Sequence, residues 1–550
     1  MFVLREDLAS KIPEITSIYL KLNTAIPKFY FCLLVQIENS VYNDKTKEFE
    51  FPINSLYFVI DNLTYLDDVK FIPMAEKKQS KDIKLKSKFI PKLYSHQVEA
   101  VKYGMNKNSW LLLDDCGLGK TISMICLAEE LHNRKEIEHC FIVCGVNSLK
   151  YNWASEIEKF SNLSYRILGM SFTKKGTRKF CSVQERCNLI KEKIDEFFVI
   201  TNIESLRSKE FAKCFNSGKN KFGMIVVDEA HRIKDPNSLS AKTILKLKCN
   251  RKIALTGTLI MNNPENAFVP LKWTNNVGCT YTEFKRMFNV YGGFGGVQVI
   301  QHKNLDILKD LISSCSLRRR KEEVLDLPEK TYITDYVEMG KEQRELYDDV
   351  SEGILSELNL LDHVPTIIEE LTINMRLRQI TSFPGSLSTN GCGSAKLDRA
   401  EELVEDITSQ GDKVVIFNTF KDSAIELNRR LKKYGSVLCT GDQTEDEISN
   451  RKDLFQNDNN VKVMVATWQK MGTGHTLHSA NYCIFVDTPW TDADFQQAAD
   501  RIYRIGQNKK VTIIKLITKD SYDERVEEIL QNKEILSGYL IDGKEMKTEQ

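Results

Sequence analysis

The sequence contains no apolar run near the ~18 residues that a membrane-spanning helix requires. Its longest apolar stretch, around Phe29–Ile37, has the length of a buried strand. The N-terminus reads Met-Phe-Val-Leu-Arg-Glu-Asp, with acidic residues where a secretory signal has a basic start. We therefore expect a protein that is neither secreted nor membrane-bound: cytoplasmic if the host is a bacterium or phage, nuclear if it is a eukaryote.

Cysteine pairs of the kinds that bind zinc are also missing. The 14 cysteines form no Cys-X-X-Cys pair and no Cys/His spacing typical of zinc ligands. The closest pair, Cys140 and Cys144, lies in an apolar run that favours a strand in the core. The cysteines are therefore expected to be reduced and mostly buried.

An excess of charge of one sign is absent as well. The chain has 77 Lys and Arg against 76 Asp and Glu, which gives a formal net charge of +1. No global electric field would attract a polyanion such as nucleic acid. Any surface that binds one must be locally basic.

Short apolar runs that alternate with amphipathic helical patterns occupy most of the chain. Because 550 residues are too many for one hydrophobic core, several domains are expected. The alternation indicates parallel sheets with crossover helices, in two α/β lobes. The predicted strands are Trp110–Leu113, Cys140–Cys144, Phe197–Thr201, Met224–Val227 and Ile253–Leu255 in the first lobe, and Val414–Phe417, Val463–Ala466, Cys483–Val486 and Thr512–Leu516 in the second.

The remaining segments have different patterns. Residues 1–75 contain strand-like runs at Phe29–Glu38 and Glu48–Phe51, with turn residues between them. Residues 76–88 are Lys-rich, which fits a solvated linker, with a nuclear-import or DNA-contacting patch as the alternative. The predicted division is an N-terminal module 1–75, a basic linker 76–88, lobe 1 at 89–320, a helical insertion and hinge 321–393 (helical at Lys341–Leu361 and Ile367–Ile380), lobe 2 at 394–537, and a tail 538–550.

A phosphate-binding loop is indicated by Asp114-Asp-Cys-Gly-Leu-Gly-Lys-Thr121, which follows a predicted strand and precedes a helical pattern at Ile122–Leu131. Gly117 and Gly119 allow main-chain N–H groups to approach phosphate oxygens. Lys120 can neutralise phosphate charge, and Thr121 can bind Mg²⁺. Asp114 stands where the generic pattern has its first glycine, and a tight structural turn before the helix is the alternative.

Two carboxylates end another predicted strand, in Met224-Ile-Val-Val-Asp-Glu-Ala-His231. Asp228 is suited to hold Mg²⁺, and Glu229 to orient the water that attacks a γ-phosphate. The alternative is an acidic pair that caps a helix. Downstream of a phosphate-binding loop, the pattern favours nucleotide hydrolysis.

An arginine pair lies near the C-terminus, in Gln497-Ala-Ala-Asp-Arg-Ile-Tyr-Arg-Ile-Gly-Gln507. Arg501 and Arg504 are three residues apart and are predicted to share one face of a helix. Arginines supplied by a second lobe can stabilise charge at a γ-phosphate. In isolation, such a pair could equally form surface ion pairs.

With these motifs in this order, the chain resembles the Snf2-type ATPases of helicase superfamily 2 over roughly residues 89–537. Further matching segments are Tyr94-Ser-His-Gln97, Val146-Asn-Ser-Leu with Asn152-Trp153, Ile200–Leu206, Leu255-Thr-Gly-Thr-Leu259 with Asn262 and Asn263, Leu317–Val324, Leu377-Arg-Gln379, Thr440-Gly-Asp442 and Arg501 with Ile505-Gly-Gln507. In this family an acid also replaces the first glycine of the phosphate-binding loop. The resemblance implies two RecA-like lobes that bind ATP and Mg²⁺.

The resemblance also implies roles for single residues. Gln97 would recognise adenine, and Arg501 with Arg504 would contact the γ-phosphate from lobe 2. Five residues would couple hydrolysis to lobe movement: His231, Thr256, Gly257, Thr258 and Gln497. Five would contact DNA: Asn152, Trp153, Thr440, Gln469 and Lys470.

Two parts of the chain match less well. Trp468-Gln-Lys-Met-Gly-Thr-Gly474 departs from the usual family sequence, so Gln469 and Lys470 fit a backbone contact and a plain loop equally. Residues Val41–Ile53 are similar to a Tyr-Asp, Thr, aromatic, Phe-Pro pattern in the accessory domain of annealing helicases, and a simple hairpin explains them nearly as well.

The expected function is therefore an ATP-dependent motor of the Snf2 type that hydrolyses ATP between its two lobes and moves along double-stranded DNA. The alternatives are an annealing or fork-remodelling enzyme that acts on branched DNA, and an ATP-gated DNA-binding scaffold with little turnover. The Arg-Ile-Gly-Gln ending argues against an unwinding or RNA-directed helicase. A targeting protein is a possible partner, and a monomer is favoured.

Overall fold

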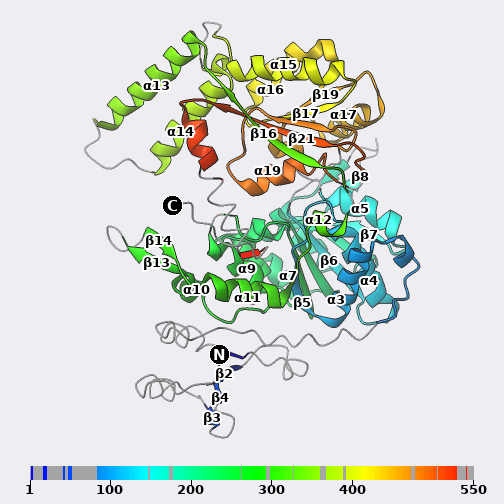
Figure 1. The fold of residues 1–550 in the computed structure, drawn as a ribbon. Coiled ribbons are helices and arrows are strands. Elements are labelled where there is room, and N and C mark those ends of the chain that lie inside the picture. Colours follow the sequence, from blue (N-terminus) through cyan, green and yellow to red (C-terminus); the bar gives the residue numbers. More distant parts are fainter. Residues whose placement is uncertain are drawn as a thin grey trace. The chain divides into compact units, whose positions relative to one another are not determined.

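The computed structural model has an α/β fold. It describes residues 2–3, 17–21, 41–43, 48–52, 83–145, 149–172, 178–261, 263–292, 298–325, 327–359, 367–387, 392–471, 477–504, 506–528, 530 and 540–541. The chain divides into two compact units, Met1–Arg320 with Ile535–Gln550, and Lys321–Glu534. Each unit is built around its own parallel sheet (Figure 1).

The first unit contains a seven-stranded sheet in the order β15-β5-β12-β11-β6-β10-β7, with every neighbouring pair parallel. The five strands predicted for this lobe are confirmed, whereas β7 and β15 were not predicted. These edge strands are too short to leave an apolar pattern in the sequence. The strands are β5 (Ser109–Leu112), β6 (His139–Cys144), β7 (Tyr165–Ile167), β10 (Phe198–Asn202), β11 (Phe222–Asp228), β12 (Arg251–Leu255) and β15 (Ser316–Leu317).

Helices cover both faces of this sheet (Figure 1). Alternate residues of one strand enter different cores, so that Phe141 packs on one face and Ile142 on the other. The helices α3 (Ser95–Asn106), α4 (Lys120–Asn133) and α5 (Leu149–Phe160) cover the face of Ile142. The opposite face is covered by α6 (Val183–Leu189), α7 (Phe211–Ser217), α8 (Leu239–Ile244), α9 (Phe268–Trp273), α10 (Tyr281–Phe288) and α11 (Leu305–Cys315).

Small antiparallel sheets complete the first unit. One pairs β8 (Met170–Phe172) with β9 (Arg178–Phe180), and another pairs β13 (Asn289–Gly292) with β14 (Gln298–His302). The N-terminal residues form a sheet in the order β1-β2-β4-β3, from β1 (Phe2–Val3), β2 (Ser17–Lys21), β3 (Val41–Asn43) and β4 (Glu48–Pro52). The strand predicted at Glu48–Phe51 is therefore confirmed, and the one predicted at Phe29–Glu38 lies outside the described residues.

The second unit contains a six-stranded parallel sheet in the order β16-β21-β20-β17-β19-β18. All four strands predicted for this lobe are confirmed. Its strands are β16 (Lys330–Val337), β17 (Val414–Asn418), β18 (Ser436–Cys439), β19 (Val463–Thr467), β20 (Tyr482–Phe485) and β21 (Val511–Thr518). Its helices are α12 (Lys321–Val324), α13 (Lys341–Asn359), α14 (Ile367–Ser382), α15 (Ala395–Ser409), α16 (Lys421–Arg430), α17 (Glu445–Asn457), α18 (Trp468–Met471) and α19 (Asp492–Ala499).

The segment 321–393 differs in one respect from the expected helical insertion. The helices α13 and α14 lie where they were predicted, but β16 is an edge strand of the sheet and pairs with β21 over its whole length. Tyr332, Ile333 and Tyr336 of β16 are exposed, which hides the alternation of a half-buried strand. Strand β16 could therefore not be recognised from the apolar pattern, and β18 was missed because only one of its four residues is buried.

The cysteines behave as expected among the residues described. All 13 of those cysteines are free, and nine of them are buried. Burial raises the pKa of the Cys140 and Cys144 thiols well above the usual value. Among the described helices, none is long and apolar enough to cross a bilayer.

The C-terminal part of the predicted linker packs against α4. Glu130 of α4 is fully buried, and its Oε2 atom accepts hydrogen bonds from the main-chain N–H groups of Lys86 (2.8 Å) and Ser87 (2.9 Å). Arg134 donates to the carbonyl of Lys84 (2.8 Å) and forms an ion pair with Glu130 (2.9 Å). Residues 84–87 are therefore fixed to the first unit, whereas the domain boundaries as a whole remain a prediction.

We expect Glu130→Ala to destabilise the first unit. The substitution leaves the buried N–H group of Ser87 and the part-buried N–H group of Lys86 without an acceptor, at a cost of up to about 1–3 kcal/mol each. The free energy of unfolding in urea should fall by about 2–4 kcal/mol. Glu138→Ala, at a carboxylate whose side chain is 66% exposed, is the control. An equal loss in both variants would contradict the role given to Glu130.

Candidate functional site

Three adjacent parallel strands bring the predicted catalytic segments to one edge of the first sheet. In the register of the sheet, Leu112 of β5 pairs with Leu255 of β12, and Leu255 pairs with Asp228 of β11. The loops that follow these strands are the phosphate-binding loop, the segment from Thr256 and the Asp-Glu-Ala-His segment. Carboxyl ends of parallel strands are where ligands bind in open α/β sheets.

The phosphate-binding loop turns sharply into α4. Gly117 and Gly119 have positive φ angles of 88° and 79°, and Gly119 is the N-cap of α4. A Cβ atom at Gly119 would lie 2.2 Å from Nε2 of Gln97. Glycine is therefore required at this position both by the backbone conformation and by the close approach of Gln97.

Gln97 and His96 hold this loop from α3. The Oε1 atom of Gln97 accepts from the N–H of Tyr94 (3.1 Å), and its Nε2 atom donates to the carbonyl of Leu118 (3.1 Å). Nε2 of His96 lies 2.9 Å from the same carbonyl, and burial lowers the pKa of His96. Burial therefore favours the neutral form of His96, and Nε2 is the donor because the carbonyl oxygen can only accept. Both residues position the loop, a role that the sequence did not indicate for His96.

Lys120 and Thr121 begin α4. The Nζ atom of Lys120 donates to the main-chain carbonyls of Asp114 (2.7 Å) and Asp115 (3.2 Å), so that the ammonium group lies over the loop. Thr121 is half-buried in the first turn of the helix. The helix N-terminus, the glycines and the ammonium group together suit an anion such as a polyphosphate.

Asp114 has a structural partner that explains its place in the loop. Its side chain is 2% exposed and forms a two-point ion pair with Arg319, through Nη2–Oδ2 (2.5 Å) and Nε–Oδ1 (3.0 Å). A glycine at position 114 would leave the buried Arg319 guanidinium without this carboxylate. The acid is therefore an integral part of this loop.

Asp228 is a buried carboxylate at the end of β11. Its oxygens accept from Nε1 of Trp153 (2.8 Å) and from the N–H of Glu229 (3.0 Å). Burial raises the pKa of Asp228 to about 6, and the Glu229 carboxylate adds to the increase. The Trp153 hydrogen bond and the positive charge of Lys120 oppose it. The hydrogen bond from Trp153 and the charge of Lys120 favour the charged form that a metal ion needs.

Glu229 adopts an unusual backbone conformation. Its φ angle is +53°, in the left-handed region that non-glycine residues rarely occupy. A Cβ atom at Gly145, which follows β6, would lie 2.8 Å from the Cβ atom of Glu229. Strain of this kind costs about 1–3 kcal/mol and is concentrated at functional sites. Gly145 therefore makes room for a Glu229 conformation that the fold imposes.

A hydrogen-bond network joins the Asp-Glu-Ala-His segment to the segment after β12. Nδ1 of His231 lies 3.1 Å from Oγ1 of Thr256 and 3.3 Å from Oε2 of Glu229. The Thr256 hydroxyl donates to the carbonyl of Thr258 (3.0 Å), so the proton in the contact with His231 must come from Nδ1. Gly257 lies close to Cys116 of the phosphate-binding loop. Three of the predicted coupling residues of the first unit, His231, Thr256 and Thr258, thus form one hydrogen-bond network.

The expected DNA contact at Trp153 does not suit its surroundings. The side chain is 1% exposed, and its indole N–H donates to Asp228, so Trp153 supports the carboxylate instead of facing a nucleic acid. Its neighbour Asn152 is half-buried on α5. An aromatic residue on an amphipathic helix gives no sign of which polar partner its ring will meet.

The arginine pair of the second unit differs from the prediction. The helix α19 ends at Ala499, so Arg501 and Arg504 lie beyond it, in a turn and a bend, and do not share a helical face. Arg501 is 7% exposed, and its Nε atom donates to the carbonyl of Gln497 (2.9 Å). Arg504 is half-buried. The spacing of three residues therefore predicted a shared helical face wrongly, because the helix ends before Arg501.

The other expected residues of the second unit lie in varied surroundings. Gln497 is buried in α19. Thr440 is fully buried, and its hydroxyl donates to Oε1 of Gln443 (3.2 Å), which does not suit a DNA contact. Gln469 is exposed and Lys470 half-buried in α18. Of the DNA contacts expected in this unit, Gln469 is therefore the most accessible.

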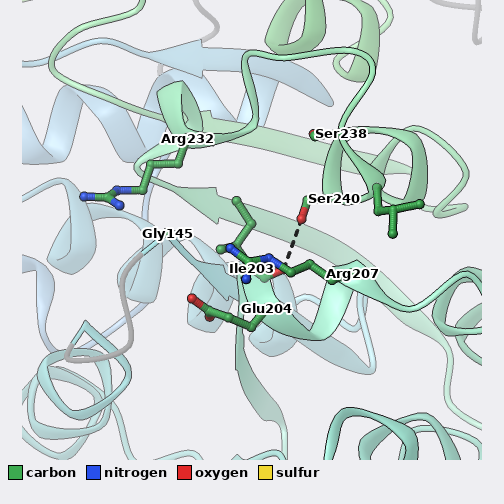
Figure 2. Close-up of a pocket in the computed structure, with 8 residues that line it drawn as sticks. Gly145, Ile203, Glu204, Arg207, Arg232, Ser238 and Ser240 are labelled. Atoms are coloured by element: carbon green, nitrogen blue, oxygen red, sulfur yellow. Dashed lines mark hydrogen bonds between the residues drawn. The ribbon is translucent and has the colours of Figure 1, made fainter. Parts of the chain in front are cut away.

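A basic pocket that the sequence did not reveal lies at the carboxyl edge of the first sheet (Figure 2). It has a volume of about 370 Å³. Two exposed arginines contribute to it, Arg207 at the end of the 3-10 helix Ile203–Arg207 and Arg232 in the 3-10 helix Ala230–Ile233. The lining residues are Gly145, Ile203, Glu204, Arg207, Arg232, Ser238, Leu239 and Ser240.

The oxygen donors of the site suit a hard divalent cation that is bound partly by the protein and partly by the phosphates of a nucleotide. Thr121 and Asp228 supply a hydroxyl and a carboxylate, which are oxygen donors of the kind that Mg²⁺ prefers. In the described part of the chain there is no group of three or more His, Cys, Asp or Glu side chains able to hold a metal alone. Mg²⁺ typically binds through one or two protein oxygens together with phosphates and water.

The raised pKa of Asp228 predicts a pH-dependent effect on stability. Between about pH 4 and pH 6 the unfolded chain loses the Asp228 proton before the folded protein does, so this group lowers stability as the pH rises. Asp228→Asn removes the penalty and keeps an acceptor for Trp153. The variant should therefore gain thermal stability relative to the natural protein at pH 8 and lose that advantage at pH 4. An advantage that is independent of pH would contradict the assignment.

Comparison with protein-family models gives two matches. The SNF2-related domain matches residues 70–386, and the helicase conserved C-terminal domain matches residues 395–506. The first match includes the phosphate-binding loop and the Asp-Glu-Ala-His segment, and the second includes Arg501 and Arg504.

Curated relatives come from bacteria and eukaryotes. An uncharacterized ATP-dependent helicase of Mycoplasma pneumoniae is 29% identical over 518 residues, which cover 92% of this chain and 48% of that protein. The putative ATP-dependent helicase/translocase YwqA of Bacillus subtilis is 27% identical, over 82% of this chain and 49% of that protein. The ISWI chromatin-remodeling complex ATPase ISW1 of Saccharomyces cerevisiae is 26% identical, over 79% of this chain and 39% of that protein. The chain thus spans about half the length of the curated relatives it matches, or less.

Among solved structures, the Sulfolobus solfataricus SWI2/SNF2 ATPase core in complex with dsDNA is 26% identical, with a TM-score of 0.38 over 82% of this chain and 93% of that chain. The family match itself covers more than half of the sequence. The chain belongs to the SNF2-related family, whose members among its relatives carry the names of ATP-dependent helicases and chromatin-remodelling ATPases.

Proposed function

We propose that this protein is a DNA-stimulated ATPase that hydrolyses ATP with Mg²⁺ and moves along double-stranded DNA. The observation that carries the proposal is the meeting of three catalytic segments at one edge of the first sheet, fixed by the register of β5, β12 and β11. The names of the relatives, ATP-dependent helicases and a putative translocase, support the same conclusion.

The residues of the first unit have distinct roles in this proposal. Lys120 and the N–H groups at the start of α4 bind the phosphates, and Gln97 with His96 keeps the loop in shape. Thr121 and Asp228 hold Mg²⁺, which neutralises phosphate charge when bound. Glu229 orients the attacking water, since its carboxylate lies next to Asp228 at the end of β11.

Coupling between hydrolysis and movement is assigned to the His231 network. Glu229 contacts His231, and His231 contacts Thr256. A movement of the Glu229 carboxylate during hydrolysis can therefore be transmitted through His231 to the segment after β12. Gln497, Arg501 and Arg504 are assigned to the second unit's part in hydrolysis, with the arginines stabilising charge at the γ-phosphate.

Contact with DNA is assigned to the basic pocket in Figure 2. Arg207 and Arg232 are exposed, and Ser238 adds a hydroxyl group. All three side chains can donate hydrogen bonds to phosphate oxygens. The pocket adjoins Gly145 and so lies next to Glu229. Binding to the phosphate backbone implies weak sequence preference and strong salt dependence.

Two alternatives differ in their substrates and turnover. An annealing or fork-remodelling enzyme is supported by the Val41–Ile53 pattern, part of which forms the antiparallel pair β3 and β4. An ATP-gated scaffold would bind DNA with little turnover. The intact set of Lys120, Asp228 and Glu229 favours an enzyme over the scaffold.

The first test measures ATP hydrolysis by the purified protein without nucleic acid and with duplex DNA, single-stranded DNA, branched DNA or RNA. We expect duplex DNA to stimulate hydrolysis at least tenfold, and Glu229→Gln to abolish the stimulated rate because the attacking water loses its orienting carboxylate. Glu192→Gln, at an exposed glutamate, is the matched control.

The other outcomes of this assay distinguish the motor from the two alternatives. A preference for branched over plain duplex DNA would favour the remodelling enzyme. A lack of stimulation by every DNA would contradict the motor and leave the scaffold. Displacement of a third strand from a triplex by the active protein, and none by Glu229→Gln, would establish movement along the duplex.

The second test concerns the basic pocket. Arg207→Gln with Arg232→Gln should weaken binding to duplex DNA for all sequences alike, because phosphate contacts carry no sequence information. The slope of log affinity against log salt concentration should become less negative by about 2, close to 0.9 for each lost phosphate contact. Lys221→Gln, at an exposed lysine before β11, is the control. An unchanged slope would move the DNA interface away from this pocket.

A further inference from the structure

The segment that joins the two units is hydrogen-bonded to the phosphate-binding loop. The strand β15 pairs with β5, and the pairing continues beyond both strands. The N–H of Leu113 donates to the carbonyl of Leu317 (2.8 Å), and the N–H of Asp115 donates to the carbonyl of Arg319 (3.1 Å). The main chain of the connection therefore runs alongside the loop that is proposed to hold ATP.

Side chains strengthen this attachment. Arg319 forms its two-point ion pair with Asp114, contacts Glu99 of α3 (3.2 Å) and donates to the carbonyl of His96. Arg318 forms an ion pair with Asp115 (2.7 Å). The Arg319 side chain is 8% exposed, so its guanidinium is fixed by buried charge and hydrogen bonds and not by a loose surface pair.

Two residues further on, the chain is attached just as firmly within the second unit. The Nζ atom of Lys321 lies 2.6 Å from a carboxylate oxygen of Asp500 and donates to the carbonyl of Tyr503 (2.7 Å). The side chain is 4% exposed, and its ammonium group lies over the ring of Tyr503. Asp500 and Tyr503 each precede one of the two arginines assigned to hydrolysis.

Covalent geometry limits how independently these two attachments can move. The Cα atoms of Arg319 and Lys321 can be no more than about 7 Å apart, since each residue extends the chain by at most ~3.6 Å. Arg320 is the single residue between them. A rearrangement of the units must therefore turn about Arg320 or break one of the two attachments.

We propose that Arg318–Lys321 is a short strap that links the phosphate-binding loop mechanically to the Asp500–Arg504 segment, and that Arg319 and Lys321 are positioning residues for ATP hydrolysis. The effect on hydrolysis rests on the proposed function, whereas the mechanical link does not. The opposite view is that each attachment only stabilises its own unit, in which case the length of the connection between them has no effect.

The first measurement changes the length of the strap and leaves both attachments in place. Two glycines inserted between Arg320 and Lys321 should lower the DNA-stimulated kcat at least tenfold, with the KM for ATP within twofold of the natural value. The same insertion after Gly340, where a Cβ atom would meet nothing within 4 Å, is the control. A local stabilising role would not separate kcat from KM in this way.

The second measurement needs no hydrolysis. Lys321→Met removes the charge in the second unit, and amide hydrogen exchange is followed at Leu113 and Asp115 in the first unit. We expect exchange at these amides to become at least tenfold faster. Lys515→Met removes the charge of a half-buried lysine in the second unit that pairs with Glu527 (2.6 Å), and it should change the exchange rates at Leu113 and Asp115 less than twofold.

The outcomes separate the strap from the proposed function. An unchanged kcat in an active insertion variant, or unchanged exchange in Lys321→Met, would overturn the strap and leave the ATPase standing. If the natural protein does not hydrolyse ATP with any DNA, the proposed function fails, and the exchange measurement alone decides whether the link exists.

Discussion

The parallel register of β5, β12 and β11 is the constraint on which the candidate site depends. Leu112, Leu255 and Asp228 are in register across three neighbouring strands, so the loops that follow them start at the same level. Residues more than a hundred positions apart in the chain thereby meet without any long excursion of the backbone. A slip of one residue in β11 would turn Asp228 to the other face of the sheet.

Buried charge sets the fine geometry at this edge. Asp114 and Arg319 compensate each other, as do Lys321 and Asp500 in the second unit. The hydrogen bonds to Asp228 among the described residues come from neutral donors, Trp153 and the N–H of Glu229, and burial raises the pKa of Asp228. This difference in pairing fits two different roles. The paired charges stabilise the fold, whereas a buried carboxylate with a raised pKa can bind a cation.

The elements were largely predictable because buried parallel strands are continuous apolar runs. The runs at Cys140–Cys144 and Val463–Ala466 could be placed almost to the residue. Strand β16 could not, since three of its large apolar side chains are exposed and its neighbours in the sequence are helical. The end of α19 before Arg501 was also missed, because local spacing does not show where a helix stops.

The sequence by itself determined the order of the motifs, the α/β class and the types of residue at the phosphate-binding loop and at Asp228 and Glu229, because these follow from local chemistry and spacing. Only the tertiary structure decided that Trp153 supports Asp228, that Arg319 completes the phosphate-binding loop and that Arg207 and Arg232 share a pocket. Each of these pairings joins distant parts of the chain, and no local pattern of residues encodes which side chains a folded sheet brings together.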